Sequence, residues 1–212
     1  MEPSSFYHVY NRSNNKEDLF RRNINREAFL EKLGKYLNPF LKIFAYCLMN
    51  NHFHLLVQVR NEHDILKAIR DAKQIDLCKI QRQALFQEKE DVSYSRIVHT
   101  QFQRFFTSYS RTFNAAEKRK GNLLNRPFKR ILVDSDSYFN QLIYYIHSNP
   151  LHHGTQIDFH NYDWSSYKSH LSSKSTFLER EEVISWFGNR ERYIRFHQKP
   201  QNFEEIDRWL IE

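Results

Sequence analysis

Met-Asn-Asn-His-Phe-His-Leu-Leu-Val-Gln-Val, residues Met49 to Val59, is the stretch that decides the fold. Side chains alternate between the two faces of a β-strand, so the apolar residues at 53, 55, 57 and 59 share one face. His52 and His54 then lie together on the opposite face. The pattern predicts a strand with its apolar face on the core and two histidines close enough to bind one metal ion. Two half-exposed, hydrogen-bonded histidines are the alternative reading.

Three further segments complete the predicted sheet. Residues 41–48 are apolar and precede Asn50-Asn51, a pair that suits the tight turn of an antiparallel hairpin. Residues 6–12 are rich in aromatic and β-branched side chains, and residues 128–133 form another short apolar run. We therefore expect an antiparallel sheet that presents the histidines beside a hairpin turn.

Apolar residues at helical spacing predict four helices around this sheet. Their expected ranges are 25–37 with Asn25 as N-cap, 64–80 with Asp64 as N-cap, 97–114, and 138–148. Prolines at 39 and 150 should end the helices that precede them. The aromatic stripe of the helix over 97–114 is expected to be core, and the polar segment 81–95 a connection.

Length and glycine content limit the function classes. The chain of 212 residues suits one domain over residues 1–155 with a mainly helical appendage over residues 156–212, packed on the domain by its aromatic residues. It contains four glycines and neither of the glycine-rich patterns that bind dinucleotides or nucleotide triphosphates. We expect no small-molecule cofactor.

The two cysteines, Cys47 and Cys78, are far apart and form no CxxC pair, so neither a disulfide framework nor a thiolate metal site is indicated. The first residues lack the basic start and apolar run of a signal peptide, and no apolar stretch approaches the length that spans a membrane. We expect a cytoplasmic protein with no membrane partner.

Positive charge is concentrated between residues 96 and 130. This segment has nine Lys and Arg and one Glu, a net charge of +8 in a chain whose total is +7. A concentrated basic segment suits a polyanionic partner such as DNA, and a solvated helix face is the alternative. The expected DNA contacts are Arg12, Arg104, Arg111, Lys118, Arg119, Lys120, Arg126, Lys129 and Arg130.

The helix over 138–148 carries the second reactive set. Tyr145 and Asn149 are four residues apart, so they are neighbours on one surface of a helix. Tyr144 points about 100° away from Tyr145, and its partner one turn later is Ser148, a poorer metal ligand than an amide. Asn149 has an alternative role as the helix C-cap before proline.

Taken together, these motifs resemble the HUH single-tyrosine transposases of the insertion-sequence type, and most closely the REP-associated tyrosine transposases. The resemblance extends over most of the chain. It rests on Tyr7 to Arg12, Met49 to Leu56, Pro127 to Arg130, Tyr145 to Pro150 and Trp164 to Tyr167. Two departures concern Ser13, where the family commonly has glycine, and residues 151–153, which lack an arginine of the family pattern.

This resemblance implies an α+β fold, a ferredoxin-like or RRM-like antiparallel sheet backed by helices with the histidines on its open face. It implies that His52, His54 and Asn149 bind a divalent metal ion, Mg²⁺ or Mn²⁺, and that Tyr145 is the nucleophile. The implied activity is a single-stranded DNA endonuclease and strand transferase that acts through a 5′-phosphotyrosine intermediate. The implied partner is single-stranded or hairpin DNA.

A non-catalytic module that binds single-stranded nucleic acid on an RRM-like sheet is the alternative function. Such a module needs aromatic platforms on its central strands, and the RNP1 pattern is absent from this sequence. For the oligomeric state we expect a monomer, with a homodimer that exchanges the tyrosine helix as the alternative that the insertion-sequence relatives imply.

Overall fold

The computed structural model describes residues 1–72, 77–86, 91–133, 136–152 and 158–199. Four strands form one antiparallel sheet in the order β2-β3-β1-β4. Their bounds are Phe6–Arg12 for β1, Leu41–Leu48 for β2, His52–Val59 for β3 and Lys129–Val133 for β4. The strand expected over 128–133 therefore begins one residue later, and the other strands agree with the prediction.

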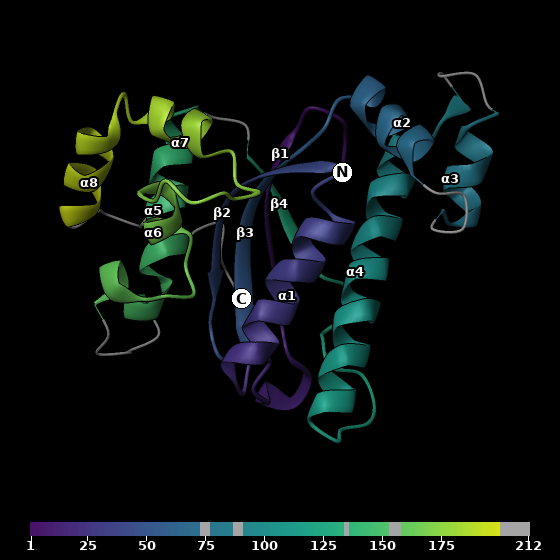
Figure 1. The fold of residues 1–212 in the computed structure, drawn as a ribbon, viewed down its shortest axis with the longest axis horizontal. Helices are drawn as coiled ribbons and strands as arrows, with labels where there is room; N and C mark the ends of the chain where they lie inside the picture. The colour runs from purple at the N-terminus through teal and green to yellow at the C-terminus, as the bar shows by residue number, and fades with distance from the viewer. Residues whose placement is uncertain (73–76, 87–90, 134–135, 153–157, 200–212) are drawn as a thin grey trace.

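The described helices surround this sheet. They are α1 (Asn23–Tyr36), α2 (Glu62–Asp71), α3 (Lys79–Ala84), α4 (Tyr94–Ala116), α5 (Asp136–His152), α6 (Tyr167–His170), α7 (Arg180–Trp186) and α8 (Arg190–Gln198). Figure 1 shows three layers: α1 and α4 lie on one face of the sheet, and α5 to α8 lie on the other. The strand order and the helices between the strands correspond to two interlocked split β-α-β units, which is the ferredoxin-like topology. The predicted α+β fold is confirmed.

The side chains of β3 alternate between the two faces of the sheet as the sequence predicts. Phe53, Leu55, Val57 and Val59 are fully buried in the cluster formed with α1 and α4. Leu56 lies on the other face, in the cluster formed with α5 and the segment after it. Each buried side chain of this size stabilises the fold by about 1.5 to 3 kcal/mol, so slippage by one residue is strongly disfavoured.

The helix starts differ from the predicted N-caps. Asn25 is the third residue of α1, where its Oδ1 accepts the backbone N–H of Arg22 at 2.8 Å. Asp64 is the third residue of α2, and its backbone N–H donates to the side chain of Asn61, the true cap, at 2.8 Å. Asn25 thus satisfies a helix-terminal backbone group from inside the first turn, whereas the Asp64 backbone N–H is itself satisfied by the cap three residues earlier.

Two helix ranges were also predicted wrongly. The helix expected over 64–80 ends at Asp71, and the separate short helix α3 overlaps the start of the expected connection 81–95. Helix α4 already begins at Tyr94, inside that connection. The residues from 73 to 76 between α2 and α3 lie outside the described part. The aromatic stripe of α4 is core as expected, with Phe102, Phe105 and Tyr109 fully buried.

Helix α5 continues through Pro150 to His152, although the sequence predicted an end near that proline. Proline lacks an N–H and crowds the carbonyl four residues earlier, but near the last turn of a helix this costs few hydrogen bonds. Asn149 therefore lies inside the helix and is not its C-cap. Its side chain is fully buried, in a position to serve the site instead.

The segment after α5 packs on the side of the sheet that carries the histidines. Tyr167, Val183, Phe187 and Tyr193 share a cluster with buried residues of β2 and α5. On α5 itself, His147 lies 2.7 Å from Ser166 Oγ. The segment thus braces α5, and its described part is helical as expected. The boundary at residue 155 and the aromatic residue Trp209 lie outside the described residues.

Candidate functional site

His52 stands at the start of β3 with both ring nitrogens engaged. Its Nδ1 lies 2.7 Å from Asn51 Oδ1, and its Nε2 lies 3.0 Å from Asn149 Oδ1. Both partners are amide oxygens, which only accept, and a neutral imidazole has one N–H, so a neutral ring can donate to only one of them. With the proton on Nδ1, the Nε2 lone pair and Asn149 Oδ1 would be two acceptors 3.0 Å apart, an arrangement that a bound cation satisfies.

His54 lies two residues later on the same face, 2% exposed. Its Nδ1 is 2.9 Å from Nε2 of His8, a fully buried residue of β1. Burial lowers the pKa of His8 to about 3, so its ring is neutral at pH 7. The Nδ1 position of His54 is engaged by His8, and a metal ion bound by His54 would use Nε2.

Tyr145 projects from α5 toward these histidines. Its ring centroid lies 5.7 Å from that of His54 and 6.2 Å from that of His8. Tyr144 faces the other way and contacts Phe159 at 5.6 Å, and burial raises its pKa. Of the two tyrosines, Tyr145 is the one that the fold brings to the histidines.

Asn149 completes the set, one turn after Tyr145. Its Nδ2 is buried and has no hydrogen-bond partner within the described part of the chain. Adjacent ligands of an octahedral Mg²⁺, each about 2.1 Å from the ion, are about 3.0 Å apart, which is the distance between His52 Nε2 and Asn149 Oδ1. Two imidazoles and an amide oxygen fit a divalent ion that keeps open positions.

A group of three His, Cys, Asp or Glu side chains that could hold a metal ion is not found in the residues that the structure describes. The set at this site has two such residues and an amide. It therefore differs from the metal sites that are built only of charged or imidazole side chains, and its third member, Asn149, is the amide that the family resemblance implies.

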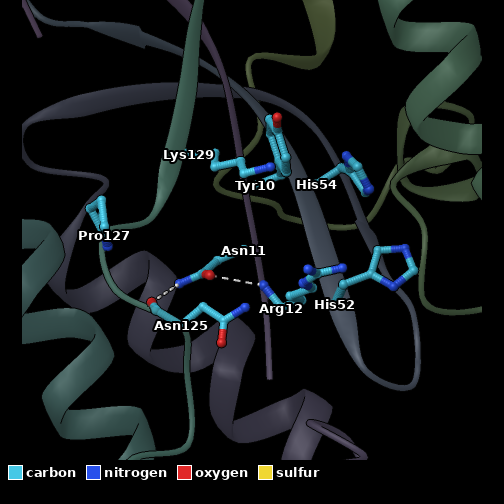
Figure 2. Close-up of a pocket in the computed structure, with 8 residues that line it drawn as sticks. All are labelled: Tyr10, Asn11, Arg12, His52, His54, Asn125, Pro127 and Lys129. Atoms are coloured by element: carbon cyan, nitrogen blue, oxygen red, sulfur yellow. Dashed lines mark hydrogen bonds between the residues drawn. The ribbon is translucent and has the colours of Figure 1, made fainter. Parts of the chain in front are cut away.

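A cavity of about 70 Å³ opens beside the two histidines, lined by β1, β4 and the loop before β4. Figure 2 shows Arg12 beside His52, and Lys129 beside the ring of Tyr10. Lys129 Nζ lies 5.6 Å from the centroid of the Tyr10 ring. Two of the predicted DNA contacts, Arg12 and Lys129, thus lie at the mouth of the histidine site.

The loop at this cavity is held by the side chain of Asn11 and the backbone of Arg12. Asn11 Nδ2 donates to the carbonyl of Asn125 at 3.0 Å, and its Oδ1 accepts the N–H of Arg12 at 2.9 Å (Figure 2). The backbone N–H of Asn125 donates in turn to the carbonyl of Arg12 at 2.9 Å. These contacts attach the loop before β4 to β1 and set the position of Arg12.

The other predicted DNA contacts lie away from the histidines. Arg104 and Arg111 line a hollow of about 420 Å³ along α4, together with Tyr36 of α1, on the opposite face of the sheet. Arg130 lines a separate hollow of about 270 Å³ with Arg96 and His99. Arg126 is exposed in the loop before β4.

The basic turn after α4 divides into two kinds of residue. Lys118 and Lys120 are exposed. Arg119 instead holds the turn together: its Nε donates to Glu17 at 2.8 Å, and its NH2 group donates to the carbonyl of Asn122 at 3.0 Å. Arg119 is thereby committed to contacts within the protein, which the sequence did not show.

Sequence reasoning missed three members of the site. His8, Tyr10 and Asn51 are not among the site residues that the sequence predicts. The alternation of side chains along β1 could have identified His8 and Tyr10, because it puts both on the face of the sheet that carries His52 and His54. The pairing of the two strands could not be read from that alternation alone.

Comparison with known proteins finds similarity to one family. Residues 3–95 match the model of the family described as Transposase IS200 like, which is 93 of the 212 residues. The match covers β1 to β3 with both histidines and does not reach Tyr145. No curated protein matches the chain in sequence.

The fold is similar to that of a REP-associated tyrosine transposase solved with a bound REP hairpin. The TM-score is 0.50 at 12% sequence identity, over 81% of this chain and 82% of that one. The expected resemblance is therefore confirmed, by sequence over residues 3–95 and by fold over most of the chain. No described helix is long and apolar enough to cross a membrane. Cys47 and Cys78 are free.

Proposed function

We propose that this protein is a metal-dependent endonuclease and strand transferase for single-stranded DNA, with Tyr145 as its nucleophile. The observation that carries the proposal is the convergence of α5 on β3. Asn149 Oδ1 lies 3.0 Å from His52 Nε2, and the Tyr145 ring lies 5.7 Å from that of His54. The residues proposed as nucleophile and as metal ligands therefore come together from separate elements, and the two histidines among them line a small cavity.

His52, His54 and Asn149 would hold Mg²⁺ or Mn²⁺. Such an ion polarises the scissile phosphate and neutralises charge that develops in the transition state. The hydroxyl of Tyr145 attacks phosphorus and loses its proton, and the bond from phosphorus to the 3′ oxygen breaks. The products are a 5′-phosphotyrosine link and a free 3′-hydroxyl. Because one phosphoester replaces another, the same site can rejoin strands.

Arg12 and Lys129 would receive the DNA backbone beside this site. Both are exposed at the cavity that the histidines line. Phosphate contacts of this kind position the strand and carry no sequence information. Unpaired DNA suits the cavity, because a single backbone can approach a histidine face that α5 partly covers. A cytoplasmic monomer that acts on hairpin-forming DNA remains our prediction.

The test incubates end-labelled hairpin DNA with single-stranded flanks with the wild-type protein, Tyr145→Phe and Tyr144→Phe. Each reaction is run with Mg²⁺, with Mn²⁺ and with EDTA, and covalent adducts are separated on a denaturing gel. We expect an adduct with the wild-type protein and with Tyr144→Phe in either metal. We expect none with Tyr145→Phe and none in EDTA.

Tyr144→Phe is the matched control, because it removes the neighbouring hydroxyl on the same helix. An adduct that survives Tyr145→Phe would refute the nucleophile assignment. Cleavage that persists in EDTA would refute metal dependence. Binding of the DNA without cleavage in any condition would instead support the non-catalytic binding module.

A further inference from the structure

We infer that His8 is a positioning residue that sets which nitrogen of His54 can bind the metal ion. The inference rests on the proposed function and concerns a residue outside the predicted metal set. His8 is fully buried, and its Nε2 lies 2.9 Å from His54 Nδ1. Tyr10 stacks on both rings, with centroid distances of 5.1 Å to His8 and 5.6 Å to His54, and so holds their planes.

One N–H joins the two facing nitrogens, His8 Nε2 and His54 Nδ1, and it has two possible directions. In the first, His8 Nε2–H donates to His54 Nδ1, so the proton of His54 is on Nε2. In the second, His54 Nδ1–H donates to His8 Nε2, and His54 Nε2 presents a lone pair. Only the second arrangement allows His54 to bind a metal ion, since Nδ1 faces His8 in both.

The second arrangement requires His8 to carry its own proton on Nδ1. That atom is buried and has no hydrogen-bond partner among the residues that the structure describes. A buried N–H without an acceptor is less favourable than a buried lone pair without a donor. The metal-free protein should therefore hold the first arrangement, and metal binding should select the second.

The proton count is the same in both arrangements. On metal binding, the Nε2 proton of His54 leaves to solvent, the shared proton passes from His8 Nε2 to His54 Nδ1, and a solvent proton is taken up at His8 Nδ1. His8 thus acts as the acceptor that metal-binding histidines usually need for their second N–H. For His52 the corresponding acceptor is Asn51 Oδ1.

The test measures Mn²⁺ affinity without DNA, from the free-ion signal in electron paramagnetic resonance. His8→Leu removes the acceptor, and we expect affinity to fall about 10- to 100-fold, the usual effect of losing such a partner. In His8→Gln the amide oxygen can accept from His54 Nδ1–H, and we expect affinity at least equal to that of the wild type. His170→Leu changes another buried histidine, remote from the site, and should leave Mn²⁺ affinity unchanged.

Nitrogen-15 spectra of the wild-type protein provide a second measurement that needs no variant. We expect His54 to carry its proton on Nε2 without metal and on Nδ1 with Mg²⁺. An unchanged tautomer in the presence of bound Mg²⁺ would overturn the inference. Equal Mn²⁺ affinity in folded His8→Leu and the wild type would also overturn it, as would equal losses in His8→Leu and His8→Gln, which indicate packing alone. A wild-type protein that binds no Mn²⁺ would refute the metal site of the proposed function itself.

Discussion

Changing Asn149 to Ala tests the third metal ligand most directly. The amide oxygen lies 3.0 Å from His52 Nε2, inside a helix that continues to His152, so the change removes a proposed ligand and no helix cap. Loss of an outer partner of a metal ligand already lowers affinity 10- to 100-fold. We expect loss of the ligand itself to lower Mn²⁺ affinity by about 100-fold.

The loss of Mn²⁺ affinity can be measured by thermal unfolding. At a Mn²⁺ concentration of 100 times the dissociation constant, binding stabilises the wild-type protein by about 2.7 kcal/mol. For a chain of this size that raises the Tm by about 5 to 11 °C relative to EDTA. With affinity lowered 100-fold, the same Mn²⁺ stabilises Asn149→Ala by about 0.4 kcal/mol, a rise of about 1 to 2 °C.

The matched control is Asn140→Ala, an amide on the same helix that donates to the carbonyl of Trp186 at 3.3 Å. Its rise in Tm with Mn²⁺ should equal that of the wild type, whatever its Tm in EDTA. A full rise of 5 °C or more in Asn149→Ala would refute the assignment of this residue as a ligand.

The remaining predictions concern charge and pH. Changing Lys118 and Lys120 to Ala should reduce the slope of log affinity for single-stranded DNA against log salt by about 1.4, and an unchanged slope would remove them from the interface. Arg119→Ala should instead lower the Tm, because it breaks the contacts to Glu17 and to the turn carbonyls; an unchanged Tm would contradict this role. Burial lowers the pKa of His170 to about 3 and that of His197 to about 4. The unfolded chain therefore binds more protons below pH 6.5, and the free energy of unfolding should fall between pH 6.5 and 4 by up to about 1.4 kcal/mol per pH unit for each. Urea unfolding should show a shallower fall in His170→Leu, and an equal slope would count against it.

Much of the sheet could be predicted from the sequence, because a strand repeats every two residues. The alternation in β3 gave the correct core face and put His52 and His54 on the other. Helical spacing likewise put Tyr145 and Asn149 on one surface and turned Tyr144 away, as the ring contacts bear out. These are relations within a single element, where the backbone repeat alone determines direction.

The helix boundaries were less predictable. Polar residues in the first turn resemble caps in the sequence, so the predicted starts at Asn25 and Asp64 fall three residues after the observed caps, Arg22 and Asn61. Proline at 150 indicated a helix end, yet the last turn tolerates it. Because α5 continues past Pro150, Asn149 lies inside the helix and is not its C-cap.

The sequence by itself determined the strands, the face that carries the histidines and the pairing of Tyr145 with Asn149, because each follows from a local repeat. Only the tertiary structure brought Asn149 to His52, 97 residues apart, paired His8 with His54, and committed Arg119 to Glu17. The physical reason is that a repeat sets the direction of a side chain within its own element. The atom that this side chain meets depends on how the elements pack, and packing is decided by burial over the whole chain.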